Sequence, residues 1–157
     1  MDDKQQLELY TKAKKCALGL LAMREHSNLE LKCKLAERGF DTKIITTVLL
    51  DIAKGGFQSD ERFAEFYVKS RMEHGYGPLR ISSELRDRGI IPEIIRRFLN
   101  KNSIDWQAQA QKAYQKKFGK LPLPNQEEKL KRLQFLQYRG FGSEHIKNIC
   151  LTEVMDG

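Results

Sequence analysis

Cysteine is scarce in this chain of 157 residues, which contains three. Cys16, Cys33 and Cys150 are odd in number, lie far apart and never form a Cys-x-x-Cys pair. Disulfide-stapled folds and structural zinc sites both need closely patterned cysteines, so the sequence favours neither. We therefore expect no bound metal and no cofactor.

Long hydrophobic runs are also missing. The longest apolar stretch, Ala17 to Met23, is far shorter than the roughly 20 residues that a membrane-spanning helix needs. The first four residues, Met1 to Lys4, are charged and do not form the apolar core of a signal peptide. These features predict no membrane association and a reducing, cytoplasmic setting.

Motifs that carry catalysis are not apparent. The segment Gly75-Tyr76-Gly77-Pro78 has no preceding strand and no third glycine, both of which a nucleotide-binding loop requires. Three adjacent pairs invite an acid–base interpretation: Glu25-His26, Glu73-His74 and Glu144-His145. Neighbours on a helix point about 100° apart and seldom act together, so we predict structural histidines, no catalytic residues and no enzyme.

Helical periodicity is present throughout the chain. Apolar residues recur on one face of a helix at Ile44, Ile45, Val48, Leu49, Ile52 and Ala53. The pattern returns at Ile94, Ile95, Phe98 and Leu99, and more weakly at Ile146, Ile149 and Cys150. Helical spacing also places Phe63, Phe66 and Tyr67 in a predicted core.

A repeat of about fifty residues organises these helices. The triplets Arg38-Gly39-Phe40, Arg88-Gly89-Ile90 and Arg139-Gly140-Phe141 each precede one of the three periodic segments. A leucine stands four residues before each of these glycines, at Leu35, Leu85 and Leu136. We predict that each glycine ends a helix in a left-handed conformation, which a residue without Cβ adopts at little cost.

The repeat predicts an all-α fold of three tandem three-helix repeats, at residues 1–57, 58–102 and 103–157, which form an elongated, curved array. The expected first helices are 5–25, 60–73 and 105–118, the second are 28–38, 78–88 and 126–139, and the third begin near 42, 92 and 143. Capping residues support these starts, notably Ser27 with Glu30 and Asn125 with Glu128. The segment 119–125, with two prolines, is the expected mobile connection.

Basic residues outnumber acidic ones, 28 to 21, which gives a net charge of +7. Basic charge along the whole chain favours an extended polyanion as partner, although a merely solvated surface would look the same. Sequence-specific reading of DNA is disfavoured, because Arg96 and Arg97 have no Asn or Gln beside them to read base edges. The residues that we predict to contact the partner are Arg24, Arg71, Arg80, Arg88, Arg96, Arg97, Lys116, Lys117, Lys120 and Arg139.

Several segments resemble one known family. Leu20 to Ser27, followed by Glu30-Leu31, Lys34-Leu35 and Gly39-Phe40, is similar to the first repeat of RecX regulatory proteins. Segments within 56–68 resemble the second repeat of that family, and so do Gly77-Pro78, Arg80-Ile81, Glu84 to Arg86 and Gly89-Ile90. The third is resembled by Lys129-Leu130, Leu133, Phe135-Leu136 and Arg139 to Phe141.

The resemblance implies a non-enzymatic regulator of the RecA recombinase, with roles in homologous recombination, DNA repair and the SOS response. Family members are arrays of three-helix repeats that lodge along the groove of the RecA–DNA filament and block recombination, ATP turnover and coprotease activity. We therefore expect a monomer whose partners are the RecA filament and, weakly and non-specifically, single- and double-stranded DNA. The first alternative is a general DNA-binding helical protein that competes for single strands. The second is an enzyme of DNA repair, whose turnover would be destroyed by replacement of one residue such as His26 or Glu73.

Overall fold

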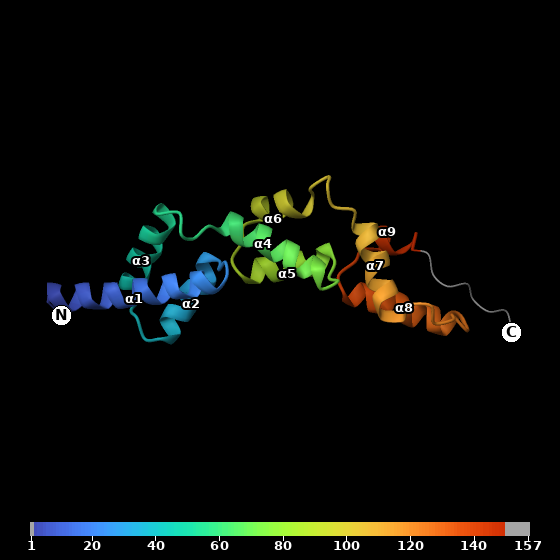
Figure 1. The fold of residues 1–157 in the computed structure, drawn as a ribbon, viewed down its shortest axis with the longest axis horizontal. Coiled ribbons are helices and arrows are strands. Elements are labelled where there is room, and N and C mark those ends of the chain that lie inside the picture. Colours follow the sequence, from blue (N-terminus) through green and yellow to red (C-terminus); the bar gives the residue numbers. More distant parts are fainter. Residues whose placement is uncertain (1, 150–157) are drawn as a thin grey trace. The chain divides into compact units, whose positions relative to one another are not determined.

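The computed structural model describes residues 2–149, and Figure 1 shows its helices. In chain order they are α1 (Asp3–Met23), α2 (Asn28–Glu37), α3 (Thr42–Lys54), α4 (Asp60–Glu73), α5 (Pro78–Asp87), α6 (Pro92–Leu99), α7 (Trp106–Phe118), α8 (Gln126–Tyr138) and α9 (Ser143–Ile146). Within residues 2–149 no β-strand forms, so the prediction of an all-helical fold is confirmed. Cys150 lies outside the described residues. No helix in this range has the length and apolarity to cross a membrane.

The helices begin where local capping predicts. Ser27 and Glu30 form a complete capping box at the start of α2. Asn125 accepts a hydrogen bond from the backbone of Glu128 at the start of α8, and Asp41 accepts one from Ile44 at the start of α3. These bonds satisfy backbone N–H groups that the first turn of a helix leaves without partners.

Helices α2, α5 and α8 end two residues before a glycine. Gly39, Gly89 and Gly140 have φ values of +88°, +79° and +98°, which confirms the predicted left-handed turns. In each case the backbone N–H of the residue after the glycine donates to the backbone carbonyl of the buried leucine in the preceding helix, with N···O distances of 3.1–3.2 Å. The short triplet thus turns the chain sharply between the second and third helix of each repeat.

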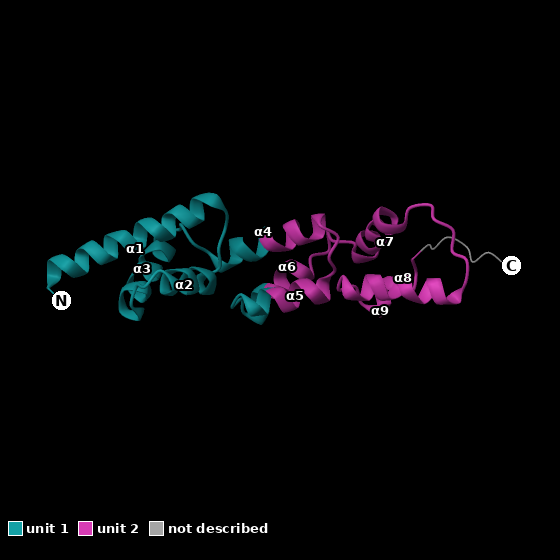
Figure 2. Ribbon diagram, turned by 90° about the horizontal axis from the view of Figure 1, so that it is seen from below, with its two compact units in different colours: residues 1–66, 85–94 teal, residues 67–84, 95–157 magenta. Residues whose placement is uncertain are grey.

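The described chain forms two compact units, which Figure 2 distinguishes by colour. Unit 1 comprises residues 1–66 and 85–94, and unit 2 comprises residues 67–84 and 95–157. Helices α4, α5 and α6 each contribute residues to both units. The predicted repeat boundaries, at 57/58 and 102/103, stay a prediction.

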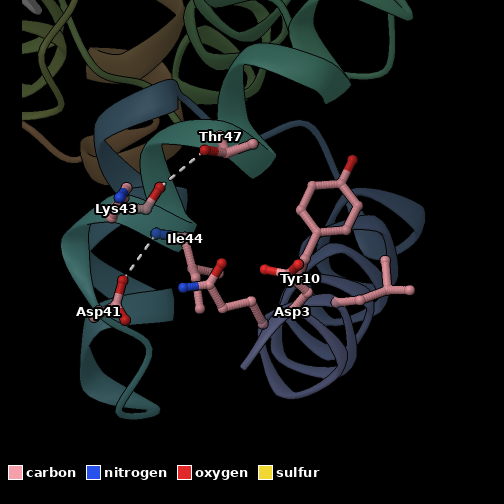
Figure 3. Close-up of a pocket in the computed structure, with 8 residues that line it drawn as sticks. Asp3, Tyr10, Asp41, Lys43, Ile44 and Thr47 are labelled. Atoms are coloured by element: carbon pink, nitrogen blue, oxygen red, sulfur yellow. Dashed lines mark hydrogen bonds between the residues drawn. The ribbon is translucent and has the colours of Figure 1, made fainter. Parts of the chain in front are cut away.

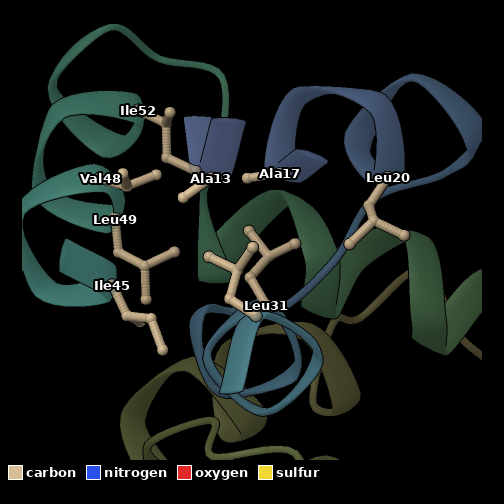
Figure 4. Packing of buried hydrophobic residues seen from close by; sticks show 9 residues of the cluster. Ala13, Ala17, Leu20, Leu31, Ile45, Val48, Leu49 and Ile52 are labelled. Atoms are coloured by element: carbon tan, nitrogen blue, oxygen red, sulfur yellow. The ribbon is translucent and has the colours of Figure 1, made fainter. Parts of the chain in front are cut away.

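The core of unit 1 forms where α1, α2 and α3 meet (Figure 4). Helix α1 contributes the small residues Ala13 and Ala17, which are fully buried and allow the neighbouring helices to approach closely. Leu31 comes from α2, and α3 contributes Val48 and Ile52 from the apolar face predicted from its periodicity. Ala53, which that prediction also placed on this face, is exposed. Each fully buried Leu, Ile or Val stabilises the fold by about 1.5–3 kcal/mol relative to an exposed position.

Unit 2 has its own core between α7, α8 and the segment around α9. It contains Tyr114, Leu136, Phe141 and Ile146, all at most 6% exposed. Ala110 and Ala113 lie in the same cluster and line the contact surface of α7.

Two core predictions need correction. Phe63 is fully buried, but Phe66 is 38% exposed and Tyr67 is half-buried. The buried face of α4 runs through Phe63, Ala64 and Val68. Phe66 is two residues from both Ala64 and Val68, so at about 100° per residue it points to the opposite side of the helix.

Candidate nucleic-acid and partner interface

Two of the predicted arginines converge on one carboxylate in unit 1. Arg24 donates to both oxygens of Glu30, at 3.1 and 3.2 Å, and Arg88 Nε lies 3.7 Å from Oε2 of the same residue. Burial raises the pKa of Glu30, but hydrogen bonds from Arg24 and from the Ser27 backbone outweigh it and hold the pKa below its ordinary value. The carboxylate that caps α2 thus also balances part of the charge of Arg24 and Arg88.

Arg71 and Arg80 share a second carboxylate, in unit 2. Arg71 forms a bidentate pair with Glu84, at 3.0 and 3.1 Å, while Arg80 Nε lies 3.8 Å from Oε2 of that carboxylate. Both guanidinium groups also lie over the ring of Tyr76, at 3.8 and 4.5 Å from its centroid. Such contacts attract a cation to the negative face of the ring. These two arginines therefore stabilise the turn between α4 and α5.

Arg139 completes the surroundings of Tyr76. Its guanidinium carbon lies 4.7 Å from the centroid of the Tyr76 ring, and its Nη1 donates to the backbone carbonyl of His74 at 3.0 Å. Within residues 2–149 no carboxylate lies within ion-pair distance of Arg139, and its guanidinium also lies 5.1 Å from the centroid of the Phe135 ring.

The turn that contains Arg139 also closes the start of α5. The backbone N–H of Gly77 donates to the Arg139 carbonyl at 2.7 Å, and that of Leu79 donates to the Gly140 carbonyl at 2.9 Å. A Cβ on Gly140 would lie 2.4 Å from the Cβ of Arg80, closer than real Cβ contacts. The glycine therefore serves close packing as well as the turn itself.

The remaining predicted residues are exposed. Arg96 and Arg97 lie on the polar side of α6, opposite Ile94, Ile95, Phe98 and Leu99, which are at most 8% exposed. Lys116 and Lys117 belong to the last turn of α7, where positive charge favours the helix dipole, and Lys120 follows that helix. The structure thus shows Arg24, Arg71, Arg80 and Arg88 beside carboxylates, and it shows Arg96, Arg97, Lys116, Lys117 and Lys120 on exposed surfaces.

A small pocket in unit 2 gathers three of the predicted cations. It has a volume of about 220 Å³ and is lined by His74, Gly75, Ala113, Lys116, Lys117, Phe135 and Arg139. Lys117 Nζ and the Arg139 guanidinium lie 5.8 and 5.1 Å from the centroid of the Phe135 ring. The lining contains no carboxylate, which makes the pocket suited to an anion.

A second pocket, in unit 1, has a mixed lining (Figure 3). It lies between α1 and α3, has a volume of about 410 Å³, and presents Asp3, Asp41 and Lys43 around Leu7 and Ile44. Tyr10 also lines it, and its hydroxyl donates to Asp51, which raises the pKa of the phenol. Because acidic and basic side chains both line this open pocket, it favours neither an anionic nor a cationic ligand.

His26 and His74 each contact a nearby backbone carbonyl. His26 is buried, its Nδ1 lies 3.0 Å from the Arg24 carbonyl, and burial lowers its pKa. His74 Nδ1 lies 2.7 Å from the Ser70 carbonyl, one turn back in α4. Across the described part of the chain, no three potential metal ligands of the His, Cys, Asp or Glu type come together.

Sequence reasoning missed Arg132, the most buried charged residue described. Its side chain is 3% exposed and donates to Glu128, the Tyr114 hydroxyl and the carbonyls of Leu121 and Pro122. These bonds attach the carbonyls of Leu121 and Pro122 to α8, and the mobility predicted for the segment 119–125 stays a prediction. Glu128 and Arg132 stand four residues apart on a helix, a spacing that predicts their ion pair. The spacing does not predict that the Arg132 side chain is buried.

Comparisons with known proteins agree with the three-helix organisation. Three family models, described as the first, second and third three-helix domains of RecX, match residues 13–50, 59–99 and 104–150. A regulatory protein RecX from Halorhodospira halophila is 43% identical over 131 residues, which cover 83% of this chain and 81% of the relative. One from Legionella pneumophila is 40% identical over 139 residues, which cover 88% and 93%.

Solved structures share the fold. A crystal structure of regulatory protein RecX matches with a TM-score of 0.78 at 23% identity and covers 95% of this chain and 77% of that one. The crystal structure of RecX from Lactobacillus salivarius matches with a TM-score of 0.76 at 20% identity and covers 90% and 94%. At these identities the likeness concerns the fold alone.

Proposed function

Because this chain belongs to the RecX family of regulatory proteins, we propose that it binds the RecA–DNA filament and suppresses RecA's recombinase, ATPase and coprotease activities. It would thereby modulate recombination and DNA repair as a binding protein, without a reaction of its own. Such a filament is strongly negative, so a partner gains affinity and speed of association from exposed positive charge.

The observation that carries this proposal is the polar side of α6. Arg96 and Arg97 are adjacent and exposed, while the four apolar residues of the same helix are almost fully buried. The helix is therefore held by its apolar face, and its two arginines can face a partner without loss of the core. Arg24, Arg71, Arg80 and Arg88 lie beside the carboxylates of Glu30 and Glu84, so part of their charge is balanced within the protein.

Charge reversal on α6 tests the proposal. Arg96→Glu and Arg97→Glu together should raise the concentration for half-suppression of RecA's ATPase about tenfold or more, because each lost attraction becomes a repulsion. The assay mixes purified protein with preformed RecA filaments on single-stranded DNA and follows ATP hydrolysis. Circular dichroism first checks that helicity is unchanged.

A matched control separates a local contact from net charge. Lys12 and Lys15 are exposed on α1, and their double reversal to Glu changes the net charge by the same amount. This control should suppress RecA as the parent does. If the α6 variant also suppresses RecA like the parent, α6 does not face the filament.

The second candidate is competition for single-stranded DNA without contact to RecA. The anion-suited pocket of unit 2 favours it, because its lysines have no acidic partner in the lining. Suppression that falls in proportion to bare-DNA affinity across a series of variants would favour competition over filament binding.

A further inference from the structure

We infer that the pocket formed by His74, Gly75, Lys116, Lys117, Phe135 and Arg139 is a binding site for one backbone phosphate of a DNA strand. This inference rests on the proposed function, which brings the chain to a filament that contains DNA. It adds a defined site, located in unit 2 and separate from the exposed pair on α6.

The charges of the pocket are the first argument. Most arginines of the predicted set are held by carboxylates: Arg24 and Arg88 by Glu30, and Arg71 and Arg80 by Glu84. Within residues 2–149, Lys116 and Lys117 have no carboxylate within ion-pair distance, and no acidic residue lines the pocket. An anion that enters would therefore meet positive charge without displacing an internal partner.

The position of Arg139 is the second argument. Its Nη1 donates to the His74 carbonyl at 3.0 Å, and its guanidinium packs on the rings of Tyr76 and Phe135. A guanidinium has five N–H donors, and the carbonyl uses the donor of one nitrogen. Arg139 is thus held in place on the pocket wall, so that less conformational entropy is lost when it binds a phosphate.

Size is the third argument. A volume of about 220 Å³ is smaller than the roughly 300–1,000 Å³ of sites that enclose a drug-sized ligand. It holds a phosphate group with some water, while the rest of a nucleotide remains outside. A strand that passes across the mouth of the pocket meets this condition, because its sugars and bases can stay on the surface.

Removal of the two lysine charges tests the site. In the variant Lys116→Gln with Lys117→Gln, the affinity for a fluorescent oligothymidylate should fall about tenfold, as expected for loss of a charge-assisted contact. The slope of log affinity against log salt should become shallower by about 0.7, the value for one phosphate contact with a single strand. Fluorescence anisotropy at several salt concentrations measures both, and the emission of Trp106, the single tryptophan, checks that unit 2 is folded.

The control variant is Lys12→Gln with Lys15→Gln, which removes the same charge from α1 in unit 1. Its salt slope should equal that of the parent. Equal losses of affinity in the two variants would mean that only net charge matters, and the phosphate site would be refuted.

Competition distinguishes the source of the anion. At constant ionic strength, inorganic phosphate should not displace the oligonucleotide at concentrations where an unlabelled strand does, since a single strand adds contacts outside the pocket. Displacement by inorganic phosphate at equal concentration, or by polyglutamate with the same dependence on Lys116 and Lys117, would overturn the assignment to a DNA strand.

The two proposals fail separately. If Lys116→Gln with Lys117→Gln binds the oligonucleotide like the parent, the phosphate site is wrong whatever happens to RecA. If the α6 variant suppresses RecA like the parent while the lysine variant loses DNA affinity, the α6 interface is wrong and the phosphate site stands.

Discussion

Replacement of Gly140 by Ala tests whether this glycine holds two repeats together or only turns the chain. The comparison is Gly39→Ala, because both glycines follow the second helix of a repeat with similar φ values, +98° and +88°. A Cβ on Gly39 would meet nothing within 4 Å, whereas one on Gly140 would lie 2.4 Å from Arg80 Cβ and 2.6 Å from Arg80 N. The pair therefore separates backbone strain from packing.

The magnitudes follow from these contacts. A left-handed conformation costs a residue with Cβ about 1–2 kcal/mol, which is the whole expected effect of Gly39→Ala. In Gly140→Ala the start of α5 must also move away. The hydrogen bonds from Gly77 to Arg139 and from Leu79 to Gly140 are then weakened, at about 0.5–1.5 kcal/mol each. We expect Gly140→Ala to lower the free energy of unfolding by about 2–5 kcal/mol in total.

Urea unfolding followed by two signals measures the difference. Trp106 lies in unit 2, so its fluorescence reports on the part of the chain that contains Gly140, while circular dichroism reports on all helices. Gly140→Ala should shift the fluorescence transition strongly, and Gly39→Ala should shift mainly the circular dichroism transition. Equal costs for the two variants would refute the reasoning, because the close contact with Arg80 would then contribute nothing.

Two further predictions concern buried polar groups. Arg132→Met should destabilise unit 2 by about 2–4 kcal/mol in the Trp106 transition, because it leaves the Tyr114 hydroxyl and two loop carbonyls without their donor. The control Lys131→Met, on the exposed side of α8, should change the stability by no more than about 0.5 kcal/mol. Equal effects of the two variants would contradict a structural role for Arg132. Burial lowers the pKa of His26, so the folded state binds fewer protons than the unfolded state. The contribution of neutral His26 is therefore present above its ordinary pKa of 6.5 and is lost as the pH falls through its lower folded pKa. Unfolding measured across that range should show a steeper acid loss in the parent than in His26→Gln, and parallel curves would contradict the assignment.

The sequence alone determined the helices and their ends. The signals for these features lie within a few residues of one another: the Ser27 and Glu30 capping box, the periodic face of α3, and the glycines after the second helices. Burial of Leu85 was predictable for the same reason, since its spacing from Gly89 repeats that of Leu35 and Leu136. Local backbone hydrogen bonding and the helical period decide such features before any tertiary contact forms.

Only the tertiary structure decided which positive charges are neutralised. Arg88 is paired with Glu30 and Arg71 with Glu84, and the partners lie on different helices, too far apart in sequence for helical spacing to match them. The same holds for Arg132, which looks like any surface arginine until the carbonyls of Leu121 and Pro122 are brought to it. An ion pair or a buried charge depends on which surfaces the fold places together, because the energy of each interaction falls steeply with distance and with exposure to water. Identical residue types along this chain therefore hold the fold at some positions and face solvent at others.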